Sequence, residues 1–257
     1  MNWTRTVRVA TAVSAVALLV VPVLPSRAAG PAACPAPKTC PAYVLDAYRW
    51  PTRPGRPLVI SYYVSSRVTV PTVPTQRLVA ATLAATQVWE RANPRIRFRF
   101  LGLTDALPGL QDGKNVVGFS VPLGLPGAEV ADAAIYYGQD NVIHEEDVSI
   151  TPQQPWTWQQ CPQRDGGCAG HSADLAPHTT VWGPELQGVL EHELGHWLSL
   201  DHADLNPNGW DATGMTMFSS TQADNMAQQT LGLGDVLAVR LAYPCGTCGG
   251  KPVVFSP

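Results

Sequence analysis

The segment His192-Glu-Leu-Gly-His196 holds two histidines four residues apart, with a glutamate directly after the first. On a helix this spacing puts both imidazoles on one face, about a turn apart, where they can bind the same metal ion. With three protein ligands and one open position, zinc lowers the pKa of a bound water molecule to about 7. Glu193 could accept a proton from that water and later deliver it to a leaving amine. The segment therefore predicts a zinc site for amide hydrolysis, rather than a helix with solvated or core histidines.

A third imidazole, that of His202, follows six residues after His196. On a continuous helix it would point away from the first two, so the chain must turn sharply after Leu198 if all three are to meet. Asp201 is the alternative ligand, through a carboxylate oxygen.

The whole segment from His192 to His202 resembles the metzincin motif HExxHxxGxxH and, within that clan, the matrixin-like zinc endopeptidases. Ser199 stands where the family usually has glycine. Glycine suits a left-handed turn, so serine there implies a cost of about 1 kcal/mol or a modified turn. Downstream, Met215-Thr-Met217-Phe218 resembles the Met-turn that lies beneath the zinc in that clan, with Met217 as the better match. Simple packing of both methionines in a core is the alternative.

The resemblance implies an α+β fold with two subdomains around a cleft. The upper one would hold a mixed twisted sheet and helices, and the smaller, irregular lower one the Met-turn and a C-terminal helix from Gly234. A single catalytic zinc would be bound by His192, His196 and His202, with Glu193 as general base. A protein or peptide substrate would pair antiparallel with an edge strand of the sheet. The candidates for substrate contact are Ala133, Ala134 and Ile135, whose alternative is an ordinary strand, and, more weakly, Phe218.

The periodicity of apolar residues supplies the elements that would position this site. A strand at 58–64, a helix from Pro74 to about Asn93 with Thr75 as N-cap, and an alternating strand at 96–100 predict a crossover between two parallel strands. Further elements are expected as strands at 116–121, 133–137 and 147–151 and as helices at 184–198 and 234–242. The sheet would be mixed, with at least one exposed edge.

Residues 1–28 have the pattern of a signal peptide, with Arg5 and Arg8 before an apolar run and a small-x-small cleavage site at its end. The apolar run is shorter than the roughly 20 residues of a membrane span, so a membrane anchor is the less favoured alternative. We therefore expect a secreted, extracellular protein with no stable membrane insertion after cleavage. The expected parts are a linker or short prosegment at 29–50, a catalytic domain at 51–244 and a disulfide-stapled tail at 245–257.

Six cysteines fit an oxidising compartment and fall into three local couples. The sequence leaves their connectivity open, although the short spacings favour bridges between neighbours. A redox or zinc role for the final CxxC is the less favoured alternative. The couples are Cys34 with Cys40, Cys161 with Cys168, and Cys245 with Cys248.

The chain has 257 residues, of which 45% are hydrophobic and 14% charged, as expected for one globular unit with a core. Its net charge is −3, and residues 1–28 contain three arginines and no acidic residue. Without these residues 14 basic groups stand against 20 acidic ones, a net charge of −6, so nucleic acid is not an expected partner. We expect a monomer. A second zinc bound by His171 and His178 stays open, although their spacing does not support it. Calcium bound by the acidic run 145–147 also stays open, but the run lacks the spacing of a calcium loop, and a solvated acidic turn is favoured.

Two other classes of function stay open. One is a secreted zinc-containing binding module whose peptidase activity is weak or lost. Ser199 favours it, whereas the presence of Glu193 opposes it, because binding alone needs no base. The other is an extracellular adhesion domain held by disulfides and containing no metal.

Overall fold

A computed structural model of the chain describes residues 42–120, 130–158, 183–210, 212, 214–221 and 227–245, and the backbone of 7–9. The fold is α+β, with a mixed sheet and three α-helices in this part of the chain, as the sequence predicts. The main strands are β3 (Leu58–Ser65), β4 (Ile96–Thr104), β5 (Val116–Phe119), β6 (Ala131–Tyr137) and β7 (Ile143–Ile150).

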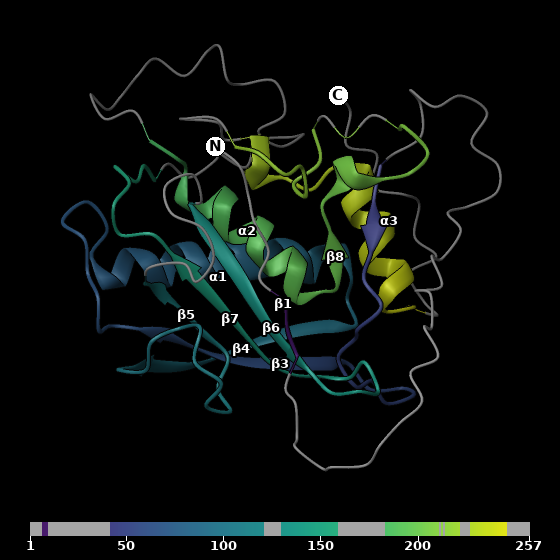
Figure 1. Cartoon of the computed structure of the whole chain (residues 1–257), viewed down its shortest axis with the longest axis horizontal. Helices are drawn as coiled ribbons and strands as arrows, with labels where there is room; N and C mark the ends of the chain where they lie inside the picture. Colours follow the sequence, from purple (N-terminus) through teal and green to yellow (C-terminus); the bar gives the residue numbers. More distant parts are fainter. Residues whose placement is uncertain are drawn as a thin grey trace.

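The strands of the main sheet lie in the order β6-β7-β5-β3-β4. Only β6 is antiparallel to its neighbour among these five, and the predicted parallel pairing of β3 with β4 is confirmed. A short sixth strand, β1 (Val7–Val9), runs parallel along the outer side of β6 (Figure 1). This strand lies within the residues that the sequence assigns to a signal peptide.

Helix α1 (Thr75–Ala92) connects β3 to β4, and its buried side includes Leu78, Ala85 and Trp89. Thr75 is not the N-cap that the sequence suggested. Pro74 takes that position, and no side chain caps the helix. The ring of proline restricts φ, here −56°, and Thr75 is already the first helical residue.

Helix α2 (Leu186–Trp197) packs against α1, β6 and β7, while α3 (Leu233–Ala242) meets the C-terminal end of α1, where the side chain of Arg240 donates to the carbonyl of Ala92. In Figure 1, β3 and β4 lie below α1 and α2, and α3 lies to the right. A second, two-stranded antiparallel sheet joins β2 (Val44–Leu45) to β8 (Leu200–Asp201). Residues 42–50, expected as part of a linker, thus contribute a strand and pack on the core. Short 3₁₀ helices, η2 and η3, span Ala203–Leu205 and Ala227–Gln229.

Strand β7 corrects one expectation. The acidic run Glu145-Glu146-Asp147 is not a solvated turn but lies inside β7, and all three side chains are buried. Burial of Asp147 and Glu145 is tolerated because their carboxylates accept hydrogen bonds from the loop before β5 and from the first residue of β5. Asp147 accepts from the amides of Gly109 and Val116 at 2.7 Å each, and Glu145 accepts from those of Asp112 and Gly113.

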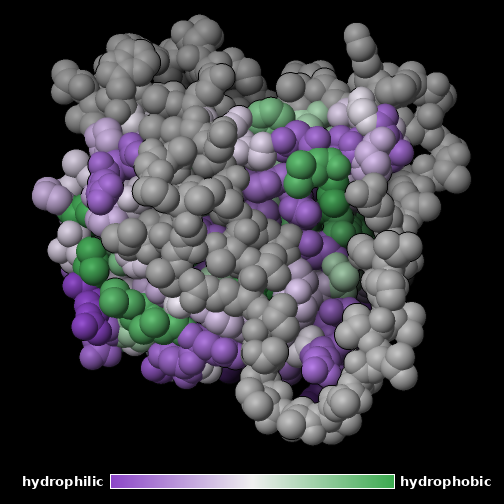
Figure 2. Space-filling view, in the orientation of Figure 1, coloured by the Kyte–Doolittle hydropathy of each residue, from purple (hydrophilic) through white to green (hydrophobic). Residues whose placement is uncertain are grey.

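The surface is mixed. On the face shown in Figure 2, hydrophilic residues surround a few small hydrophobic groups. No helix within the described ranges has the length and apolar character needed to cross a membrane.

Candidate metal centre

The helix that carries two of the three histidines is fully buried along its twelve residues. Its N-cap is Glu185, whose carboxylate accepts hydrogen bonds from the amides of Gln187 and Gly188. A carboxylate at this end also interacts favourably with the helix dipole. From α1, the indole of Trp89 donates to the carbonyl of Glu191 at 2.9 Å. The backbone of α2 is therefore held at its start and near its middle.

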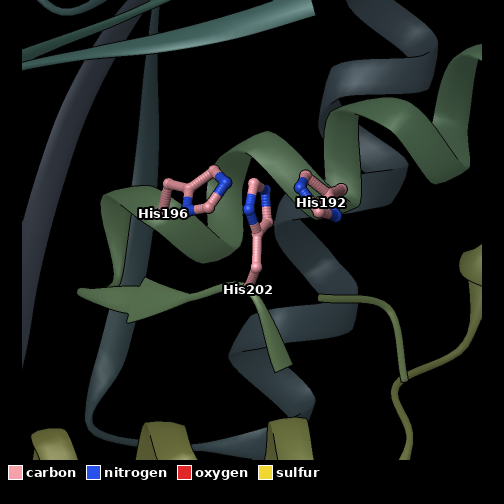
Figure 3. Close-up of side chains that lie close together, drawn as sticks. All are labelled: His192, His196 and His202. Carbon is pink, nitrogen blue, oxygen red and sulfur yellow. The ribbon is translucent and has the colours of Figure 1, made fainter. Parts of the chain in front are cut away.

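His192, His196 and His202 converge, as their spacing predicts. Each offers a ligand atom within 4.8 Å of the other two, and all three residues are buried. The ring centroids lie 4.9 to 5.2 Å apart. Figure 3 shows His202 reaching up between the two helix histidines from the chain just after β8. In the part of the chain that the structure describes, no other group of three or more possible ligands lies so close together.

The sharp turn predicted after Leu198 is present. Ser199 adopts φ +64°, in the left-handed region, and its amide donates to the carbonyl of His196 at 2.8 Å. The next two residues form β8 against β2, which brings His202 back beneath the helix. Serine thus occupies the conformation for which glycine is usually chosen.

Backbone carbonyls fix the orientation of both helix imidazoles. Nδ1 of His192 lies 2.7 Å from the carbonyl oxygen of Thr216, and Nδ1 of His196 lies 2.7 Å from that of Leu200. A carbonyl oxygen can only accept, so Nδ1 carries the proton in each ring and the lone pair is on Nε2. Burial, and then the neighbouring His202, hold the pKa of His192 well below its usual value. A neutral imidazole is the form that binds a metal ion, so the donor set fits zinc.

Two glutamates of α2 have different surroundings. Glu193, directly after His192, has 1% of its surface exposed. Glu191 instead accepts a hydrogen bond from the amide group of Gln187 at 2.8 Å, and burial raises its pKa well above the usual value. Glu191 therefore interacts within its own helix, whereas Glu193, the glutamate inside the motif, directly follows His192.

Met217 packs directly beneath the helix. It is buried, and a Cβ placed on Gly195 would come within 2.2 Å of its sulfur and 2.9 Å of the ring of Trp89. Only glycine allows this close approach. The amide of Ala203 donates to the carbonyl of Met217, which connects this segment to the chain after His202. Phe218 is half-buried beside it.

Sequence reasoning missed the carboxylate that holds the Met217 segment. Asp235, at the start of α3, is fully buried and accepts hydrogen bonds from the amides of Thr216, Met217 and Gly232. The one available signal was an acidic residue in the first turn of a predicted helix, which favours helix capping in general. That signal does not reveal which distant amides the side chain will meet.

The alternative ligand Asp201 is not part of the cluster of three histidines. One of its carboxylate oxygens accepts a hydrogen bond from the amide of His202 at 2.8 Å. That contact orients the backbone of the third histidine.

The candidate substrate residues Ala133, Ala134 and Ile135 lie on β6, next to α2, and are buried. Ile135 is paired with Val7 of β1, so this side of β6 is covered where β1 runs. Their role in binding substrate stays a prediction.

Several predicted residues lie outside the described part of the chain. They include His171 and His178 and every cysteine except Cys245. Cys245 is disulfide-bonded. The three predicted bridges and the second zinc site therefore stay predictions.

Neither the known protein-family models nor the curated proteins include a match to this chain. The resemblance to the metzincins therefore rests on the residues of the motif.

Proposed function

We propose that the protein is a secreted zinc-dependent endopeptidase, in which His192, His196 and His202 bind zinc and Glu193 is the general base. The observation that carries the proposal is the convergence of three buried imidazoles, two from a helix and one from the chain that follows the left-handed turn at Ser199. Hydrogen bonds at Nδ1 orient the two helix imidazoles toward metal binding.

The surroundings of the histidines also support the matrixin-like interpretation. Met217 lies under the helix, as the resemblance implies for the Met-turn. Among the five main strands of the sheet, β6 is the one antiparallel to its neighbour, and it lies next to the active-site helix. Secretion rests on the pattern of residues 1–28 alone. Removal of these residues would also remove β1 and expose the edge of β6 to an extended peptide.

A zinc ion bound by the three imidazoles would supply Lewis acidity that lowers the pKa of water toward neutrality. The carboxylate of Glu193 would accept the proton from the attacking water and later donate it to the amine of the cleaved bond. The main-chain groups of β6 would hold the substrate in extended form without selecting particular side chains. Peptide hydrolysis through such a water needs no covalent enzyme intermediate.

The test compares two isosteric substitutions on the same helix. Glu193→Gln is expected to keep zinc but to lower cleavage of an unstructured protein by about 10²–10⁴-fold, because it removes the general base. Glu191→Gln is the matched control. It keeps the shape of a buried side chain that faces Gln187, and we expect it to retain both zinc and cleavage.

Zinc content by elemental analysis and cleavage with and without a chelator are the two measurements. A wild-type protein that binds no zinc would overturn the proposal. Zinc without chelator-sensitive cleavage would favour the binding module instead. Equal cleavage by Glu193→Gln and the wild-type protein would remove Glu193 from the mechanism.

A further inference from the structure

The turn that carries His202 back to the helix depends on a residue in an unfavourable conformation. Ser199 has a φ of +64°, a backbone conformation that residues other than glycine rarely adopt, and it is fully buried. A hydroxyl buried in this position also needs a hydrogen-bond partner. Both requirements arise from the replacement of glycine by serine.

Tyr243 supplies that partner. The hydroxyl oxygens of Ser199 and Tyr243 lie 3.0 Å apart, and either can donate. Burial raises the pKa of Tyr243 to about 12, so its phenol keeps its proton. Tyr243 follows α3 directly and is itself buried. The tyrosine is 44 residues away in the sequence, so the contact fixes the turn to a separate element.

The backbone around Tyr243 is held in turn by α1. The side-chain amide of Asn93, at the end of α1, donates to the carbonyls of Val239 and Tyr243 at 3.1 and 2.9 Å. The phenol is therefore presented to Ser199 from a position that both α1 and α3 define.

The same phenol oxygen reaches the end of α2 by a second path. It accepts a hydrogen bond from the amide of Trp50 at 3.3 Å, and the indole of Trp50 donates to the carbonyl of Trp197 at 2.8 Å. The carbonyl of Ser199 accepts from the amide of Asp46 at 3.0 Å. The turn is thus held on its side chain and on its backbone, three residues before the third histidine.

We infer that Tyr243 is a positioning residue for the metal centre, which acts through the hydroxyl of Ser199 to hold the left-handed turn that places His202. This inference rests on the proposed zinc site. It assigns to Tyr243 the task that the flexibility of glycine performs in the usual motif. The specific consequence is that the need for the phenol should disappear when Ser199 is replaced by glycine.

The experiment is a double-mutant cycle read out as zinc affinity, measured by competition with a chromophoric chelator. In the presence of Ser199, Tyr243→Phe is expected to weaken zinc binding about 10–100-fold, as for other residues that orient metal ligands. Ser199→Ala, which removes the hydroxyl through which the phenol holds the turn, is expected to weaken it similarly. When Tyr243→Phe is combined with Ser199→Gly, the added effect should be within about twofold of none.

The control is Tyr62→Phe, which removes the hydroxyl of another fully buried tyrosine and is expected to leave zinc affinity unchanged. Urea unfolding of the metal-free variants separates stability from binding. A role of Tyr243 in stability alone would lower the free energy of unfolding at unchanged zinc affinity, and this result would overturn the inference. An equal loss of zinc affinity with Ser199 or glycine would also overturn it. A wild-type protein that binds no zinc would overturn the proposed function and the inference together.

Discussion

Asp235 and Asp147 are both buried aspartates that hold backbone amides, but only Asp235 is connected to the histidines. Asp235 accepts from three amides and Asp147 from two. Burial raises both pKa values, that of Asp235 to about 6 and that of Asp147 to about 8. Hydrogen bonds to a carboxylate favour its charged form, so the additional amide fits the smaller rise at Asp235. Nearby Glu145 also raises the pKa of Asp147.

The two carboxylates accept hydrogen bonds from amides of different segments of the chain. Asp235 fixes Thr216, whose carbonyl orients the imidazole of His192, and Met217, which supports the helix at Gly195. Asp147 fixes the loop before β5, on the far side of β7 from β6. The same local chemistry should therefore support the metal centre in one region and only the fold in the other.

The largest effect is expected for Asp235→Ala. Loss of the carboxylate leaves three amides without their acceptor, which should lower the free energy of unfolding by roughly 3–5 kcal/mol. Zinc affinity should fall about 10–100-fold as well, because the carbonyl that orients His192 is no longer fixed. Urea unfolding in the presence of a chelator and zinc competition measure the two effects. Wild-type zinc affinity in a folded Asp235→Ala protein would contradict the proposed connection.

A smaller effect, limited to stability, is expected for Asp147→Ala. Two amides lose their acceptor, so the free energy of unfolding should fall by roughly 2–3 kcal/mol. Zinc affinity should equal that of the wild-type protein, because Asp147 bonds to the amides of Gly109 and Val116, whereas the carbonyls that orient the helix histidines belong to Thr216 and Leu200. The same two measurements apply, and this variant is the matched control for Asp235→Ala. A loss of zinc affinity here would show that the regions are not independent.

The comparison also shows which parts of the molecule the sequence could predict. Regular periodicity predicted the helix before β4 and the parallel strands on either side of it. The spacing of the histidines predicted both their convergence and the turn after Leu198, because only a turn can bring His202 back to the helix. These inferences needed only local geometry.

The missed features depend on partners distant in the sequence. Three consecutive acidic residues indicate a solvated turn, and the strand predicted at 147–151 begins four residues later than β7, which starts at Ile143. The amides that allow Asp147 to be buried lie more than 30 residues earlier, at Gly109 in the loop before β5 and at Val116, the first residue of β5. In the same way, nothing near Ser199 indicates Tyr243. Local patterns do not show where a buried polar side chain finds its partner.

The smallest expected effect is a difference in pH dependence. Because the pKa of Asp147 is raised from 3.8 to about 8 on folding, its contribution to stability is full below pH 3.8 and is lost as the pH rises through 8. For Asp235 the contribution is lost as the pH rises through about 6. Between pH 6 and 8, Asp147 should therefore make the free energy of unfolding of the wild-type protein fall by up to about 1.4 kcal/mol per pH unit, and Asp147→Asn should remove this slope. Asp235→Asn should reduce the slope only below pH 6. Urea unfolding across pH 5–9 with a chelator present measures both slopes. Identical pH windows for the two variants would mean that the number of amides does not distinguish these carboxylates.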